Sequence, residues 1–441
     1  MSIDHARVDL GFLHMVKVIL TQFIVFAHSC FIAISYVKSI NDKIEYATMN
    51  SAQVMSFIGA KIVETSFLIS GLLRSYTFLQ KSNSQLIGDP LIWLKLILLC
   101  MIRVIPTYMF VHWYVELISP YTGSGPYWDY GVDERSMKGH CMRDSTFWNS
   151  LPPLVNIVPY CLGPGWFLVV YTKIAVVLPA VVYVIYSLRN QLTRIVFVSF
   201  IVACSVAFTS MKMLNQTVIS YDNISAYGAL LIGLFNSYQD MGYTSPISRI
   251  GVVAIGCLLG CWLHQYEIDA NRQWPRIIRS KMIKFVTYTM NVAVLLLLPV
   301  AGAELESWSG KSTNMKQVVI SNAVLSVLWP CLNSLLVIYL STALKNDSVK
   351  RFCNHPLWQV ISKLGLCILL IHLEILLTVS ISPGSGPMYE SWLDAVKTWT
   401  FTSFCCLIMA PVIHVLFEIP VTGLLLRIVI GRHSTVEPKK S

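Results

Sequence analysis

Two ionisable residues in the first long apolar segment, Lys17 and His28, have a spacing that could serve chemistry. His28 follows Lys17 by eleven positions, close to three helical turns, and no charged residue lies between them. On a helix they would share one face, about 16 Å apart along the axis. A neutral imidazole can accept a proton near pH 7, and an ammonium can bind an anion. Alternatively, Lys17 extends to lipid headgroups and His28 bonds to a neighbouring helix.

Other ionisable residues also lie within apolar segments, where such groups are functional candidates by default. Lys61 and Glu64 are three positions apart, so they could pair on a helix. Arg103, Lys173 and His372 lie in later apolar segments. A bundle held together by packing alone would hardly need so many charged groups. Their number therefore predicts a polar cavity within the membrane.

The elements that must position these residues are membrane-spanning helices. Of the 441 residues, 55% are apolar and 13% are charged, and the mean hydropathy is +0.61, which is outside the range of soluble proteins. Stretches of about twenty apolar residues recur, and each could cross about 30 Å of hydrocarbon as a helix. The apolar stretches lack the alternation typical of a β-barrel. The predicted fold class is therefore all-α, a polytopic transmembrane helical bundle.

Ten membrane-spanning helices are predicted along the chain. They lie near residues 12–37, 52–73, 91–118, 164–188, 194–212, 248–265, 282–303, 317–343, 357–380 and 396–417. A further apolar segment at 226–238 is short, and counting it as a span would reverse every later loop. We expect it to be an interfacial or re-entrant segment.

The distribution of Lys and Arg predicts the orientation of the bundle. These residues concentrate in alternate loops, which places both termini in the cytoplasm. Residues 119–163 then form an extracytoplasmic loop and residues 426–441 a basic cytoplasmic tail. The sequons at Asn215 and Asn223 fall in one predicted outer loop, where glycosylation can occur. The net charge of +10 is spread over the inner loops, which argues against nucleic acid as a partner.

The twelve cysteines fall into two groups. Most lie in or beside predicted spans, as small apolar residues. Cys257 and Cys261 are four positions apart, but no His or carboxylate joins them, so no metal site is expected there. Cys141 and Cys161 lie in the predicted outer loop, and oxidising compartments favour disulfides. Their spacing alone leaves open whether they are paired.

Several motifs together resemble the membrane acyltransferase-3 family. The Lys17-x10-His28 pattern is similar to the family's Arg-x10-His signature. "VETSFLISGLL" (63–73) resembles its Asp-Thr-Phe-Phe-x-x-Ser-Gly segment, and "RVIPTY" (103–108) is similar to its Arg-x-x-Pro-x-Tyr. The motifs occur in the family's order.

Further motifs resemble the animal "nose resistant to fluoxetine" branch of that family. The run "GPYW…C…FW…N…C…GWFL" is matched from Gly125 to Leu168. "YTSPISRIGVVAIGCLLG" (243–260) resembles the branch's Tyr-x-x-Pro-x-x-Arg-Ile motif and the Gly-x-x-x-Gly that follows it. "LLIH" ending at His372 and "FEIP" (417–420) resemble its late signatures. The resemblance implies an acyltransferase-3-like transmembrane domain over 1–425, lacking the large extracellular N-terminal domain usual in that branch.

The resemblance also implies a chemistry. Family members move an acyl group, typically from acyl-CoA, onto a hydroxyl of a lipid or sugar-like acceptor, so we expect an acyltransferase for groups other than amino-acyl groups. Its partners would be membrane lipids and acyl-CoA, with no bound cofactor and no metal. His28 would be the general base. Four residues would bind substrates: Lys17, Glu64, Arg103 and His372. A matching cysteine pair implies a disulfide between Cys141 and Cys161.

The sequence departs from the family pattern at several of these positions. Lys17 stands where the family has Arg, which replaces a bidentate fork by a point charge. Glu64 replaces Asp, and Cys100 stands where a second Arg is often found. After "GWFL" the family usually has an acidic residue and then a polar one, whereas this chain has Tyr171-Thr172-Lys173. The alternative function is therefore a catalytically degenerate lipid or drug carrier with the same fold.

The orientation can be tested by a glycosylation-site scan. We expect an engineered sequon within 119–163 to be modified and one within 266–281 to remain unmodified, because the Lys and Arg distribution places the second segment in the cytoplasm. Gel mobility before and after deglycosylation measures the result. Modification of the sequon in 266–281 would overturn the predicted orientation.

Overall fold

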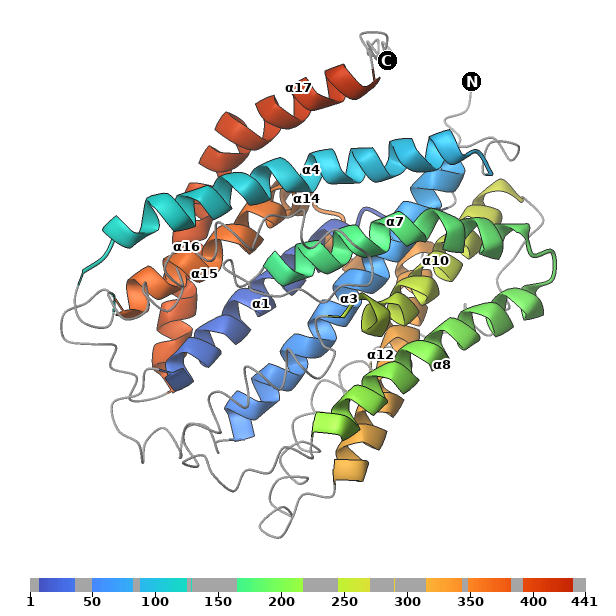
Figure 1. Ribbon diagram of the computed structural model, residues 1–441, viewed down its shortest axis with the longest axis horizontal. Coiled ribbons are helices and arrows are strands. Elements are labelled where there is room, and N and C mark those ends of the chain that lie inside the picture. Colours follow the sequence, from blue (N-terminus) through green and yellow to red (C-terminus); the bar gives the residue numbers. More distant parts are fainter. Residues whose placement is uncertain are drawn as a thin grey trace. The chain divides into compact units, whose positions relative to one another are not determined.

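The computed structural model describes residues 8–35, 50–81, 88–124, 128, 165–216, 245–269, 289, 315–342, 348–381 and 392–430, and most of them are helical (Figure 1). The long helices are α1 (Leu13–Ser35), α3 (Asn50–Lys81), α4 (Pro90–Leu117), α7 (Gly165–Ser187), α8 (Gln191–Gln216), α10 (Pro246–Ile268), α12 (Met315–Thr342), α15 (Gly365–Ile381) and α16 (Trp392–Ile413). The shorter ones are η1 (Ser119–Tyr121), α13 (Ser348–Cys353), α14 (Pro356–Lys363), η6 (His414–Glu418) and α17 (Ile419–Ile430). This confirms the predicted all-α class.

Within these ranges, seven helices are long and apolar enough to cross a membrane, or eight if 348–363 and 365–380 form one span. The protein is therefore an integral, multi-pass membrane protein. The predicted span at 52–73 lies in the 32-residue helix α3, which is long enough to cross a membrane but is not one of these seven, because it carries the charged residues Lys61, Glu64 and Arg74. The predicted span at 282–303 lies outside the described residues. The observed helices are consistent with a polytopic bundle, and the count of about ten spans stays a prediction.

The last two predicted spans differ locally from the observed helices. The segment predicted as one span at 357–380 is divided between α14 and α15. The span predicted at 396–417 belongs to a longer helical stretch in which α16, the π-helical turn η6 and α17 follow one another without a gap. Pro420 contributes to this turn, because its ring would clash with the carbonyl group four residues earlier in a regular α-helix.

Several predicted features lie outside the described residues. They are the segment 226–238, the glycosylation site Asn223, both cysteines of the expected disulfide (Cys141 and Cys161), most of the loop 119–163 and the tail from residue 431. Asn215, the other sequon, lies in the last turn of α8.

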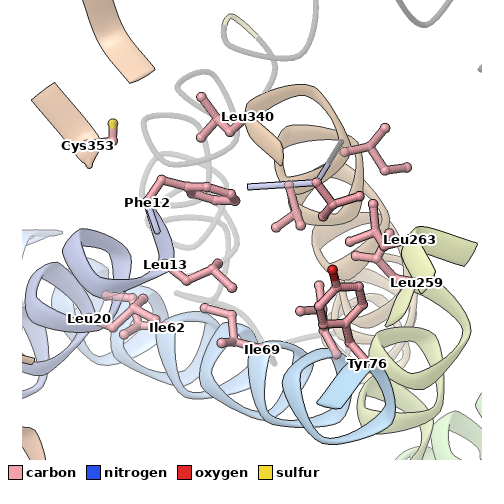
Figure 2. Close-up of a cluster of buried hydrophobic side chains, with 14 residues drawn as sticks. Phe12, Leu13, Leu20, Ile62, Ile69, Tyr76, Leu259, Leu263, Leu340 and Cys353 are labelled. Carbon is pink, nitrogen blue, oxygen red and sulfur yellow. The ribbon is translucent and has the colours of Figure 1, made fainter. Parts of the chain in front are cut away.

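The chain divides into two compact units. The first unit contains 1–88, 177–363 and 387–397, and the second contains 89–176, 364–386 and 398–441. The first unit is built around a cluster of buried apolar side chains from α1, α3, α10 and α12 (Figure 2). Phe12, Leu72 and Leu263 are among its most buried members. These helices therefore share one core rather than forming separate pairs.

Helices α3 and α10 pack with their backbones close together, and three glycines make this approach possible. A Cβ built on Gly256 would overlap the carbonyl oxygen of Leu68, and one on Gly71 would overlap the carbonyl oxygen of Val253. A Cβ on Gly260 would lie 2.6 Å from the carbonyl oxygen of Leu72. Small residues at this spacing let membrane helices approach closely. The Gly-x-x-x-Gly motif of the sequence is thus the contact surface of α10 toward α3.

This close contact predicts the effect of one added methyl group. We expect Gly256→Ala to lower the free energy of unfolding by about 1–3 kcal/mol, because the clash is with backbone and the helices must separate. Thermal unfolding in detergent measures the change. The matched control is Gly423→Ala on α17, where an added Cβ meets nothing within 4 Å and helix propensity favours alanine. Equal unfolding temperatures for the two variants would contradict the close packing.

Candidate functional site

Helix α1 carries the lysine and histidine that the sequence paired. The helix runs without a break from Leu13 to Ser35, so Lys17 and His28 lie on one continuous helix, as the spacing predicts. Both residues are partly buried. The Thr21 hydroxyl donates to the Lys17 carbonyl oxygen at 2.9 Å, a bond that stays within the helix. The helix therefore provides the shared face that a two-ended site requires.

His14 is a neighbour of Lys17 that the sequence analysis did not identify. It lies three positions before Lys17, so the two side chains are adjacent on the helix surface. The His14 Nδ1 atom is 2.6 Å from the hydroxyl oxygen of Ser362, on α14 of the same unit. The spacing of three residues could have indicated that His14 lies beside Lys17. A histidine at the start of a span is, however, not by itself a sign of a functional site. The end of α1 that carries Lys17 therefore has two further polar groups, His14 and Ser362.

A buried group of charges lies where α3 and α10 meet. Glu64 Oε1 is 2.9 Å from Lys61 Nζ and 3.3 Å from Arg249 Nη1. All three residues are 5% exposed or less. Lys61 also donates to the hydroxyl oxygen of Ser326 at 3.2 Å, which links the group to α12. The sequence predicted the pairing of Lys61 with Glu64, and the structure confirms it.

Trp329 on α12 forms hydrogen bonds to α3 beside this charged group. Its Nε1 donates to the Lys61 carbonyl oxygen at 2.9 Å and to the Thr65 hydroxyl oxygen at 2.8 Å. A tryptophan N–H inside a membrane bundle needs such acceptors, because an unsatisfied donor in hydrocarbon is costly. Three helices are therefore joined by polar bonds around one carboxylate.

Two cations share one carboxylate in this group. Lys61 and Arg249 bring two positive charges and Glu64 one negative charge. The second oxygen of Glu64, Oε2, is buried and has no hydrogen-bond partner within the described part of the chain. The sequence analysis did not identify Arg249 as a site residue, because it lies 185 positions from Glu64. Its place in the "SPISRI" motif was the signal that could have found it.

The other predicted site residues belong to the second unit. Arg103 lies on an exposed face of α4. His372 on α15 is completely buried, with Nδ1 3.1 Å from the Ile368 carbonyl oxygen. Glu374, on the same helix, is also buried and accepts a hydrogen bond from Ser119. The structure thus brings Glu64 together with Lys61 and Arg249, while Lys17 and His28 lie on α1 of the first unit.

Two residues of the segment that follows "GWFL", Thr172 and Lys173, are also buried. Lys173 on α7 is 7% exposed, and the Thr172 hydroxyl donates to the Leu168 carbonyl oxygen at 2.6 Å. A lysine this far from water needs compensating polar contacts. This chain therefore lacks the acidic residue expected at Tyr171 and instead has a buried cation two positions later.

Comparison with known proteins gives one result. The sequence profile of an acyltransferase domain of the acyltransferase-3 type matches residues 10–418. No curated protein and no solved structure matches the chain. The matched region includes α1, the charged group on α3 and α10, and the first two residues of the late motif, Phe417 and Glu418.

The charged group predicts a large cost for removing its carboxylate. We expect Glu64→Ala to destabilise the protein by about 3–5 kcal/mol, because two buried cations lose the anion between them. The control is Glu267→Ala, which removes a partly buried carboxylate near the end of α10 that bonds to Tyr76 and Gln80. Thermal unfolding in detergent compares the variants. The double variant Lys61→Met/Glu64→Leu should recover part of the loss, and a Glu64→Ala protein as stable as the control would show that the pairing contributes little.

Proposed function

The chain belongs to the acyltransferase-3 family, and on this premise we propose that it is a membrane-bound O-acyltransferase. The donor would be acyl-CoA and the acceptor a hydroxyl group of a lipid or sugar-like molecule. The observation that carries the proposal is the unbroken helix α1, which sets Lys17 and His28 on one face about 16 Å apart. A donor with a charged head and a distant reactive thioester requires such a separation.

In the proposed reaction His28 acts as general base. Its neutral imidazole takes the proton of the acceptor hydroxyl while the oxygen attacks the thioester carbonyl carbon. The new carbon–oxygen bond forms and the carbon–sulfur bond breaks. The proton held by His28 then goes to the departing thiolate, so acyl-CoA and an alcohol become an ester and free CoA. Partial burial of His28 is compatible with a neutral ring.

Lys17 is proposed to bind the phosphates of acyl-CoA. We place both chain termini in the cytoplasm, so Lys17 lies near the side from which acyl-CoA arrives. A lysine binds phosphate as a point charge, without the fork of an arginine. His14, adjacent on the helix and in contact with Ser362, would add a second polar group at this end of the site.

Glu64, Arg103 and His372 are proposed as further substrate-side residues. Glu64 is the best supported, because its Oε2 atom is buried and has no partner among the described residues. Such a group could accept a hydrogen bond from a polar substrate. Outside the membrane, a disulfide between Cys141 and Cys161 would brace the loop 119–163, and glycans would occupy Asn215 or Asn223.

One observation favours a second function. Tyr171 stands where the family pattern has an acidic residue, and Lys173, two positions later, adds a buried cation. If that acid is needed for catalysis, the chain would keep the bundle and move a lipid or drug without changing it covalently. The two functions differ in a measurable way, because the enzyme consumes acyl-CoA and the carrier does not.

The enzyme proposal predicts separable effects of the two α1 residues. We expect His28→Ala to lower the turnover number by about 10²–10⁴-fold, the usual cost of losing a positioned general base. Lys17→Ala should mainly raise the KM for acyl-CoA, and Lys17→Arg should restore or improve it. Mass spectrometry of purified protein incubated with labelled acyl-CoA and a lipid extract measures acyl transfer.

The control for His28 is Ser29→Ala, the neighbouring buried residue, whose hydroxyl bonds to the Val25 carbonyl oxygen of its own helix. It should leave turnover unchanged. Tyr171→Asp asks whether restoring an acidic residue after "GWFL" increases the rate. Undiminished turnover in His28→Ala would remove the proposed base. No acyl transfer in any variant, together with lipid movement in vesicles, would favour the carrier.

A further inference from the structure

A compact group of three metal-ligand side chains lies in the second unit, apart from the residues of the proposed reaction. Cys367 is on α15, and His414 and Glu418 are at the two ends of the π-helical turn η6. One ligand atom from each lies within 4.8 Å of the others. Cys367 is completely buried, while His414 and Glu418 are partly buried. The group therefore opens toward its surroundings on the side of η6.

The distances show that all three side chains point at one place. Cys367 Sγ is 3.1 Å from Glu418 Oε2, and His414 Nδ1 is 2.8 Å from the same oxygen. His414 and Glu418 are four positions apart, the spacing at which two helical residues can hold one metal ion. Cys367 reaches them from 51 positions earlier than Glu418, so the third ligand comes from another helix.

The local backbone explains how the pair is presented. The Ile419 N–H donates to the His414 carbonyl oxygen, which widens the helix into a π-turn. π-Turns of this kind often occur at functional sites. Phe417 stacks on Phe110 of α4, with ring centroids 4.1 Å apart, and this contact fixes the orientation of the turn. The ligand pair is therefore held on a defined element.

Charge provides the strongest argument for a metal ion. Without one, Glu418 places a carboxylate in a membrane-spanning stretch whose ion-pair partner among the described residues is His414. A dication bound by a thiolate, a carboxylate and a neutral imidazole has a total charge of zero. A neutral assembly avoids the cost of an uncompensated charge in hydrocarbon. Because the donors are sulfur, nitrogen and oxygen, they suit a borderline-soft dication better than Mg²⁺ or Ca²⁺.

We propose that Cys367, His414 and Glu418 bind a Zn²⁺ ion that ties α15 to the π-turn between α16 and α17. Binding releases the thiol proton of Cys367, because the thiolate is the ligand. Three protein ligands leave one tetrahedral position for water or another group. From the sequence, only Cys257 and Cys261 were considered as a possible metal-binding pair. Cys367 is too distant in sequence from His414 and Glu418 to be recognised together with them. The site is independent of the proposed acyl transfer.

The test uses the full-length protein in detergent, stripped of metal by a chelator and titrated with Co²⁺ as a spectroscopic substitute for Zn²⁺. We expect one equivalent to produce a thiolate-to-cobalt charge-transfer band that Zn²⁺ displaces. Cys367→Ser should abolish the band, and His414→Gln or Glu418→Gln should weaken binding by at least about 10-fold. The control Cys406→Ser, which changes a buried cysteine on α16 outside this group of three, should retain the band.

A second measurement guards against variants that fold poorly. Zn²⁺ should raise the unfolding temperature of the unmodified protein, because a ligand that binds only the folded state stabilises it. The same addition should not raise that of Glu418→Gln. The absence of a saturable band in the unmodified protein, or a band that survives Cys367→Ser, would overturn the proposal.

Discussion

The contact between the backbones of α3 and α10 is the constraint on which the first unit depends. Apolar side chains gain little by leaving lipid for protein, so membrane helices associate through close packing and polar bonds. Gly71, Gly256 and Gly260 allow the close packing, and the carboxylate of Glu64 provides polar bonds along the same seam. The close packing keeps the charged side chains within bonding distance of one another, and these bonds offset the cost of burying them.

The contact between α3 and α10 also explains the role of two motifs that are far apart in the sequence. Glu64 belongs to "VETSFLISGLL" and Arg249 to "YTSPISRIGVVAIGCLLG", and the structure joins them in one ion pair. The glycines of both motifs lie along the same contact. Each motif therefore supplies a charged residue and the small residues that let that charge reach its partner. Trp329 and Ser326 of α12 complete the arrangement from a third helix.

Sequence reasoning recovered the fold class and most helices, since long apolar runs in a membrane can satisfy their backbone bonds as helices. It also recovered the continuity of α1 and the pairing of Lys61 with Glu64, which depend on local spacing. It missed the partnership of Glu64 with Arg249 and the group around Glu418. These contacts depend on how helices that are distant in sequence pack together, and the spacing of residues along the chain does not predict that packing. It also missed the break between α14 and α15 and the π-turn η6, where small local changes interrupt an otherwise regular pattern.

The π-turn at 414–418 fixes the rotation of everything after it. Each residue of an α-helix advances the chain by about 100° around the axis, so one extra residue in a turn rotates the following helix by about that amount. Helix α17 exposes Leu424 and Ile428 on one side. If one residue were deleted from this turn, the stretch could return to a regular α-helix, and these two side chains would turn away from their present direction. The direction in which the apolar face of α17 points is therefore set by the number of residues in the turn. The sequence of α17 sets only which residues form that face.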